Sequence, residues 1–114
     1  MKKTRVAVLG YGNVGRCAVE SVLVEPDMEL VGIIEVPEVV SKSCAYSERD
    51  PIVLQKTRIV ADASELAGVD VAILSCPSRV VRDTAALMLR RSIRTVDSFD
   101  MHHDIPALRK ELDA

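Results

Sequence analysis

The sequence predicts an α/β fold in which helices wind doubly around a parallel sheet. Three observations support this prediction: several fully apolar runs of strand length, amphipathic segments that alternate with them, and a glycine-rich turn directly after the first run. Continuous apolar runs are typical of parallel strands that are buried on both faces. Right-handed crossovers between such strands then predict a Rossmann-like sheet with the spatial strand order 3-2-1-4-5.

Length and composition narrow the class of protein. With 114 residues the chain is expected to form one domain, and with one Phe, two Tyr and no Trp its core must be aliphatic. The net charge of -2 argues against nucleic acid or an anionic membrane surface as a partner. The apolar run behind the basic N-terminus is too short for a signal peptide or a membrane span. An odd number of cysteines without zinc-like spacing predicts free thiols and a cytoplasmic protein, the three being Cys17, Cys44 and Cys76.

The glycine-rich turn reads G-x-G-x-x-G and lies between a predicted strand, Arg5 to Leu9, and a predicted helix from Asn13 to about Val24. In this context the motif indicates dinucleotide binding. The first glycine allows a tight turn, the second lets backbone approach a pyrophosphate, and the third lets the helix pack close to the strand. The alternative is a turn that binds no ligand. The candidate cofactor-binding residues here are Gly10, Tyr11, Gly12, Asn13, Val14 and Gly15.

A second strand is predicted over Met28 to Ile34, and Glu35 follows it, twenty residues after Gly15. An acid at that place in a dinucleotide-binding fold accepts hydrogen bonds from the adenine-ribose hydroxyls. Such an acid favours NAD, because the 2′-phosphate of NADP would meet a like charge. A solvated loop carboxylate is the alternative reading of Glu35.

The middle of the chain is harder to interpret. Residues 36–55 show no clear period and are expected to form a loop with one short helix at 37–42; a short strand at 56–61 and a single turn of helix at 62–66 follow. A fourth strand is predicted over 69–75, and a helix capped by Ser78 is predicted to reach Arg91. The loop between them contains Cys76, which is expected beside the cofactor, although a packing role is the alternative.

A fifth strand, Ile93 to Val96, is followed by three carboxylates and two histidines within eight residues. Open α/β sheets bind ligands at the carboxyl ends of their strands, so Asp100 is the preferred functional carboxylate. Asp104 has two readings, a cap for the last helix or a ligand contact. His102 and His103 are adjacent and point apart, so no metal site is expected.

Three blocks of the sequence resemble one enzyme family. They are Arg5 to Arg16, Pro26 to Gly32, and the segment T-V-D-S-F-D from Thr95 to Asp100, which Asp104 and Pro106 continue. The chain resembles the N-terminal part of the meso-diaminopimelate D-dehydrogenases over most of its length, 36–56 excepted. The third block is far more specific than the glycine motif.

The resemblance implies a reversible, pyridine-nucleotide-dependent oxidative deamination of meso-2,6-diaminopimelate to L-2-amino-6-oxopimelate and ammonia. It implies that the glycine turn holds the pyrophosphate and that Asp100 and Asp104 lie beside the D-amino-acid centre, with Asp100 the catalytic candidate. A base or an ordered water must take the ammonium proton before hydride leaves. The resemblance also implies that a second loop lines the cofactor, through Cys76, Pro77, Ser78 and Arg79.

Two departures from the family bear on function. The family mostly uses NADP and carries basic residues after the second strand, where this chain has Glu35 and Val36, so NADP, NAD and dual use all stay open. The family chain is much longer. Residues 1–114 are therefore expected to form an incomplete dinucleotide-binding domain that lacks the sixth strand and the substrate domain. Alone the chain is expected to bind dinucleotide weakly and to be inactive. Diaminopimelate is expected to bind only together with the missing domain. The formation of a homodimer is left open.

Two other functions compete with this reading. One is a stand-alone nucleotide-sensing module without catalysis, which the short chain favours unless residues have been lost. The other is a different oxidoreductase with the same N-terminal fold, acting on sugars or on aspartate-family aldehydes. Fold analogy alone cannot decide between these functions. The T-V-D-S-F-D block favours the diaminopimelate dehydrogenases over this other oxidoreductase.

Overall fold

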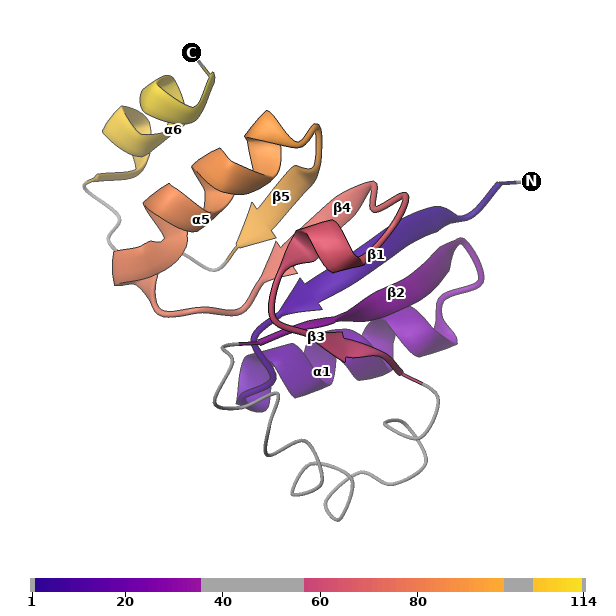
Figure 1. The fold of residues 1–114 in the computed structure, drawn as a ribbon. Coiled ribbons are helices and arrows are strands. Elements are labelled where there is room, and N and C mark those ends of the chain that lie inside the picture. The colour runs from indigo at the N-terminus through magenta and orange to yellow at the C-terminus, as the bar shows by residue number, and fades with distance from the viewer. Residues whose placement is uncertain (1, 36–56, 98–103, 114) are drawn as a thin grey trace.

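The computed structural model describes residues 2–35, 57–97 and 104–113. A single sheet runs through the middle of the molecule, with helices on both of its faces (Figure 1). In chain order the elements are β1 (Thr4–Leu9), α1 (Asn13–Val24), β2 (Met28–Ile34), β3 (Ile59–Val60), the 3-10 helix η1 (Ala63–Glu65), β4 (Val71–Leu74), α5 (Ser78–Arg90), β5 (Arg94–Asp97) and α6 (Ile105–Asp113). None of the helices in these ranges is long and apolar enough to cross a membrane.

The sheet confirms the predicted topology. Its five strands are parallel and lie in the order β3-β2-β1-β4-β5. Leu9, the last residue of β1, pairs with Ile34 at the end of β2 and with Leu74 at the end of β4. The carboxyl ends of these three strands therefore meet at one edge of the sheet, and the glycine-rich turn leaves β1 at that edge.

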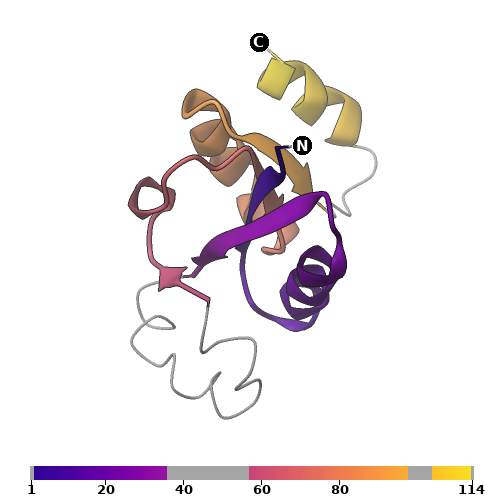
Figure 2. The ribbon, with the colours of Figure 1, turned by 90° about the vertical axis from the view of Figure 1, so that its right-hand side faces the viewer.

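The two faces of the sheet carry separate cores, because successive residues of a strand point to opposite faces. Val8 and Ile33 pack with Val19 of α1 on one face. On the other face Ala7 and Ala72 belong to a larger cluster that η1 and α5 complete through Ala63, Leu66, Ala85 and Met88. The view in Figure 2 shows α1 and α5 on opposite sides of the sheet. Buried strands covered on both sides explain why β1, β2 and β4 read as apolar runs.

Several local predictions need correction. Helical spacing in α1 puts Val14, Cys17 and Val22 on one side; Val22 is buried, but Val14 and Cys17 are exposed, and Val19 is buried although the spacing does not include it. α5 begins at Ser78 with Pro77 at its N-cap, so the prediction that Ser78 caps the helix is wrong by one residue. β5 runs from Arg94 to Asp97, one residue later than predicted. The short helix expected at 37–42 lies outside the described residues.

Candidate functional site

The glycine-rich turn is shaped by two glycines that admit no side chain. Gly10 has φ +91°, a left-handed conformation, and a Cβ there would lie 2.7 Å from the Ser75 carbonyl oxygen. A Cβ on Gly15 would collide with the carbonyl oxygen of Gly10. The turn therefore folds back on itself beside β4, which brings the start of α1 against the carboxyl ends of β1 and β4.

Gly12 differs from its two neighbours in the motif. A Cβ placed on Gly12 would meet no atom within 4 Å, so packing inside the described part of the chain does not explain the glycine. Gly12 is the N-cap of α1, and it supplies no side-chain hydrogen bond to the first turn. The first turn contains no acidic residue either. The positive end of the helix dipole thus lies at a position where no described residue would contact a Cβ on Gly12, which suits an anion.

Tyr11 contributes its backbone to the site and its side chain to the core. The side chain is 1% exposed and packs with Val8, Val19 and Ile33. The backbone N–H donates a hydrogen bond of 2.5 Å to Oε1 of Glu35. Glu35 is itself held by its own N–H, which donates to the Val60 carbonyl at 2.9 Å. Glu35 thus links the turn to the carboxyl ends of β2 and β3.

A pocket of about 540 Å³ opens at this edge of the sheet. This volume lies in the range of small-molecule and cofactor sites. The pocket spans the ends of β1, β2 and β4 and the start of α5, where an open α/β sheet reverses its winding and binds ligands. Its described lining residues are mostly apolar, with one carboxylate: Leu9, Gly10, Ile34, Glu35, Ala61, Ser75, Cys76, Pro77, Val80 and Thr84.

Two neighbouring side chains of the pocket wall have unusual surroundings. The hydroxyl oxygen of Ser75 is buried and has no hydrogen-bond partner among the described residues. Burial, and to a smaller degree the charge of Asp97, raises the pKa of the Cys76 thiol, while a backbone hydrogen bond opposes this in part. Sequence reasoning missed Ser75, because a single serine after a strand has no distinctive pattern.

The structure brings some of the predicted residues together and leaves others unplaced. Gly10, Glu35, Cys76 and Pro77 line the pocket, and Tyr11 is hydrogen-bonded to Glu35. The backbones of Ser78 and Arg79 lie in the first turn of α5, but their side chains are outside the described part of the structure. Asp100, His102 and His103 also fall outside it. Among the described residues no group of three or more His, Cys, Asp or Glu side chains could hold a metal, so the expectation of no metal stays a prediction.

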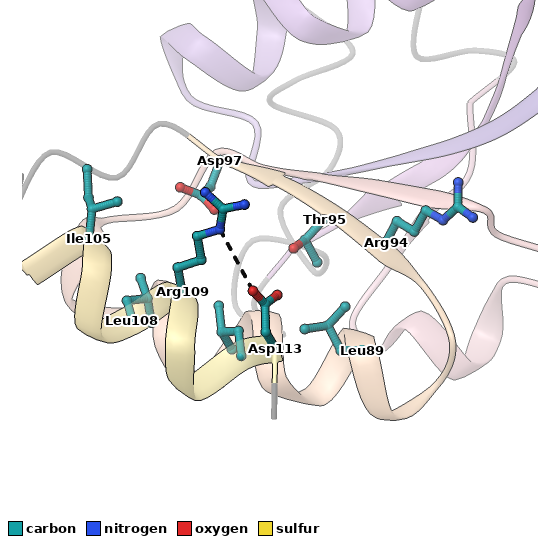
Figure 3. Close-up of a pocket in the computed structure, with 9 residues that line it drawn as sticks. Leu89, Arg94, Thr95, Asp97, Ile105, Leu108, Arg109 and Asp113 are labelled. Atoms are coloured by element: carbon teal, nitrogen blue, oxygen red, sulfur yellow. Dashed lines mark ion pairs between the residues drawn. The ribbon is translucent and has the colours of Figure 1, made fainter.

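A second hollow, of about 500 Å³, lies between β5, α5 and α6. Asp97 and Thr95 of β5 face Arg109 and Leu108 of α6 across it, as Figure 3 shows. Arg109 pairs with Asp113 on the same helix at 3.8 Å. Asp104, half-buried, directly precedes α6. This hollow is separate from the glycine turn.

Comparison with known proteins identifies relatives of the whole chain. The meso-diaminopimelate D-dehydrogenase of Bacteroides fragilis is 44% identical over 114 residues, which is 100% of this chain and 36% of that protein. The enzyme of the same name from Corynebacterium glutamicum is 34% identical over 96% of this chain and 31% of its own length. The chain therefore spans about a third of the length of these relatives. No protein-family model matches the chain.

Solved structures give the same result. The diaminopimelate dehydrogenase of C. glutamicum in complex with DAP superposes with a TM-score of 0.72 and 31% identity, over 98% of this chain and 32% of that one. An engineered D-amino acid dehydrogenase bound to NADP+ has a TM-score of 0.69 and 31% identity, over 97% of this chain and 32% of its own. A putative oxidoreductase from Bacillus subtilis, with a TM-score of 0.72 but 17% identity, shares the fold alone.

Proposed function

We propose that this chain, which is homologous to the N-terminal third of the meso-diaminopimelate D-dehydrogenases, is the pyridine-dinucleotide-binding part of such an enzyme. The proposed reaction removes the amino group at the D-centre of meso-diaminopimelate. One hydride and one proton leave, and water converts the resulting imine to a carbonyl and ammonia. The proposed products are L-2-amino-6-oxopimelate, ammonia and the reduced dinucleotide.

The observation that carries the proposal is the open position in front of Gly12. Gly10 and Gly15 are explained by contacts within the protein, whereas a Cβ on Gly12, at the N-cap of α1, would meet no atom of the described residues within 4 Å. Backbone N–H groups at a helix N-terminus bind phosphate through hydrogen bonds and the helix dipole. A pyrophosphate is the group that this place fits. A related dehydrogenase that is 31% identical binds NADP+, which agrees with this assignment.

Different residues of this chain would contact different parts of the dinucleotide. Backbone at Gly12 and Asn13 would hold the pyrophosphate, while Glu35 lies at the end of β2, where the adenine ribose is recognised in such folds. The apolar wall of the pocket, including Pro77 and Val80, would exclude water. When bound, the nicotinamide supplies a hydride acceptor. Asp100 and Asp104 remain our candidates for contacting the substrate ammonium, and Asp100 for taking its proton.

The remaining assignments concern partners and compartment. We assign diaminopimelate as a substrate only together with the part of the relatives that this chain does not span. We keep the cytoplasm as the compartment, supported by Cys17 and Cys76, which form no disulfide in the structure. Neither nucleic acid nor a membrane is proposed as a partner, given the net charge of -2.

Dinucleotide binding is tested by two-dimensional amide NMR of the 114-residue chain, titrated with NAD, NADH, NADP and NADPH to millimolar concentration. This measurement detects weak binding and locates it. We expect shifts at Gly10 to Gly15, at Glu35 and in 75–84, but none around Arg5 at the opposite edge of the sheet. Gly12→Val should abolish the shifts in a chain that still folds. Shifts confined to other regions, or none with any dinucleotide, would overturn the proposal.

The deamination is tested with a chimera in which this chain replaces the N-terminal third of the B. fragilis relative. We expect meso-diaminopimelate-dependent reduction of the dinucleotide, with the Gly12→Val chimera as the inactive matched control. A chimera that folds and binds dinucleotide but does not oxidise diaminopimelate would refute the substrate assignment and leave the binding assignment standing.

A further inference from the structure

Ser75 directly follows β4, at the edge of the sheet that carries the glycine-rich turn. Its backbone N–H donates to the Leu9 carbonyl at 2.8 Å, which extends the pairing of β4 with β1 by one residue. Its carbonyl oxygen would lie 2.7 Å from a Cβ on Gly10, and its own Cβ would lie 3.4 Å from a Cβ on Gly15. The side chain of Ser75 therefore begins beside two glycines of the turn.

The hydroxyl group of Ser75 has no explanation in the packing of the protein. Its oxygen is buried and has no hydrogen-bond partner in the part of the chain that the structure describes. A buried hydroxyl without a partner loses its hydrogen bonds to water and forms no new ones, which lowers the stability of the fold. An alanine would avoid this loss, since the contacts of the Ser75 backbone and Cβ need no hydroxyl. A buried polar group of this kind calls for a role outside folding.

The position of Ser75 suits such a role, because the residue lines the pocket of about 540 Å³ together with Gly10 and Cys76. A single rotatable bond separates the hydroxyl from the backbone, so the hydroxyl can change direction without movement of the strand end. A hydroxyl both donates and accepts hydrogen bonds. Phosphate oxygens only accept them, and a hydrogen bond to a charged acceptor is stronger than one between neutral groups. A phosphate group beside the turn would therefore give this hydroxyl the partner that it lacks.

We propose that the Ser75 hydroxyl donates a hydrogen bond to the pyrophosphate of the bound dinucleotide. This inference rests on the proposed dinucleotide-binding function. Gly12 lies two residues after Gly10 and three before Gly15, the two glycines beside the Ser75 side chain. A pyrophosphate held by the backbone at Gly12 would thus lie near the hydroxyl, with the start of α1 and the end of β4 each supplying donors. The hydroxyl then serves binding, and the fold without ligand is less stable because of it.

The proposal predicts that removal of the hydroxyl changes ligand affinity without lowering stability. Ser75→Ala should weaken dinucleotide binding about tenfold or more, the effect of losing one hydrogen bond to a charged group. The same variant should unfold at the parent's urea concentration or a higher one, because it buries no unpartnered hydroxyl. A role confined to packing would instead lower stability and leave the affinity of the folded chain unchanged. Amide NMR titration with the dinucleotide that binds the parent most tightly gives the affinities, and urea unfolding gives the stabilities.

Two further variants separate the hydrogen bond from the space that the side chain fills. Ser75→Cys keeps a side chain of similar shape whose thiol is a weak donor, so its affinity should fall as in Ser75→Ala. Ser21→Ala is the matched control, with the parent affinity expected, because it removes an exposed hydroxyl of α1 that bonds the Cys17 carbonyl at 2.9 Å.

The results of these titrations separate the inference from the function on which it rests. Parent affinity in folded Ser75→Ala, or full affinity in Ser75→Cys, would overturn the role of the hydroxyl and leave the proposed function intact. Failure of the parent chain to bind any dinucleotide would overturn the proposed function itself.

Fragments of the dinucleotide test which group the hydroxyl contacts. ADP-ribose contains the pyrophosphate without the nicotinamide, and adenosine contains no phosphate. Ser75→Ala should weaken the binding of ADP-ribose by the same factor as that of the complete dinucleotide and leave the affinity for adenosine unchanged. A loss with the complete dinucleotide alone would place the hydroxyl at the nicotinamide end and overturn the assignment to the pyrophosphate. An equal loss with adenosine would show a general change of the pocket and overturn it as well.

Discussion

Single residues decide how closely the backbone of the turn can approach its surroundings. Gly10 and Gly15 are required by contacts inside the protein, since a Cβ on either would overlap backbone. Within the described ranges no such contact requires Gly12, and its φ of -80° is open to every residue type. The same motif therefore contains two kinds of glycine. One kind maintains the fold, and the other leaves room for a ligand.

This distinction predicts that two alanine substitutions will lower the free energy of unfolding by different amounts. Gly10→Ala should destabilise the chain by about 3 kcal/mol, because Ala at φ +91° is strained and its Cβ meets the Ser75 carbonyl. Gly12→Ala should destabilise the chain less, by about 0.5–1 kcal/mol, because alanine is a poorer N-cap residue than glycine but its Cβ meets no atom of the described residues within 4 Å. Urea unfolding followed by circular dichroism measures both values. Equal destabilisation by the two substitutions would contradict the steric assignment.

The surroundings of Cys76 predict a slow thiol. Because its pKa is raised, chiefly by burial, less of the reactive thiolate is present at neutral pH. In a Cys44→Ser background, alkylation of Cys76 should be about tenfold or more slower than that of the exposed Cys17. Mass spectrometry over a time course gives both rates.

A bound dinucleotide supplies the control for this prediction. Cys76 lines the pocket, so dinucleotide should slow its alkylation further, whereas the rate at Cys17 should stay the same. Equal rates at the two cysteines without ligand would show that Cys76 is not shielded as described. Equal slowing of both with ligand would point to a global effect instead of occupancy of the pocket.

At the level of elements, η1 and the end of α5 are joined by a polar contact over the shared core. Asp62 is the N-cap of η1, and its Oδ1 accepts the Ser64 N–H at 3.0 Å. The same oxygen pairs with Nη1 of Arg91, the C-cap of α5, at 2.6 Å. The pKa of Asp62 lies below its usual value of 3.8, chiefly because of the hydrogen bond from the Ser64 N–H and to a smaller degree because of Arg91.

A lowered carboxyl pKa makes stability depend on pH with a definite sign. The stabilisation from Asp62 is fully present above pH about 4, the unfolded value, and is lost as the pH falls through the lower folded value. Asp62→Asn should therefore be less stable than the parent at pH 7, with the difference vanishing in acid. Urea unfolding at a series of pH values tests this, with Asp83→Asn on α5 as the matched control. A stability difference that is the same at every pH would contradict the ionic contribution.

The elements that could be predicted from sequence are those whose pattern has one explanation. β1, β2 and β4 are apolar runs because both their faces are covered, and their bounds agree with the structure within a few residues. The buried side of α1 could not be predicted in the same way. Apolar residues surround that helix, from Val14 to Val24, so periodicity does not fix its rotation. In the structure this helix buries Val19 and Val22 against the sheet.

The candidate site was predictable where a motif names the residue, and less so elsewhere. The glycine spacing located the turn, and the end of β2 located Glu35. The bond from Tyr11 to Glu35 joins residues 24 apart and depends on how the strands pair, which spacing along the chain does not contain. Ser75 was missed for a related reason. Its hydroxyl is buried without a hydrogen-bond partner among the described residues, and a single serine after a strand has no distinctive pattern.

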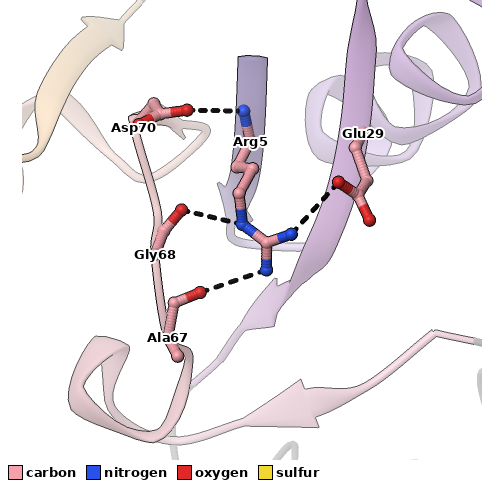
Figure 4. A network of polar contacts seen from close by, with 5 residues as sticks. All are labelled: Arg5, Glu29, Ala67, Gly68 and Asp70. Atoms are coloured by element: carbon pink, nitrogen blue, oxygen red, sulfur yellow. Dashed lines mark hydrogen bonds and ion pairs between the residues drawn. The ribbon is translucent and has the colours of Figure 1, made fainter. Parts of the chain in front are cut away.

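On the scale of the whole molecule, the two edges of the sheet have different roles. The carboxyl ends of the strands carry the turn, Glu35 and the pocket. At the amino ends Arg5 forms a network with two other segments, β2 and the connection before β4, shown in Figure 4. Its Nε donates to the Gly68 carbonyl at 2.9 Å, its Nη2 to Ala67 at 3.2 Å, and its Nη1 pairs with Glu29 at 3.1 Å. The network ties β1 to β2 and to the connection that precedes β4.

This separation predicts a substitution that changes stability and leaves ligand binding intact. Arg5→Met keeps the aliphatic stem but removes three donors, so the free energy of unfolding should fall by about 1–2 kcal/mol. Arg5→Lys should recover only part of the loss, because an ammonium lacks the planar fork that reaches two carbonyls and a carboxylate at once. Urea unfolding gives the stabilities of both variants and the parent.

Dinucleotide titration of the same variants provides the contrast. Binding constants of Arg5→Met should equal those of the parent at temperatures where both are folded, since Arg5 lies at the amino ends of the strands and the pocket at the carboxyl ends. Ser75→Ala should show the opposite behaviour, a weakened dinucleotide affinity without a loss of stability. A weakened dinucleotide affinity in a folded Arg5→Met chain would mean that the two edges of the sheet are coupled and that the site depends on the Arg5 network.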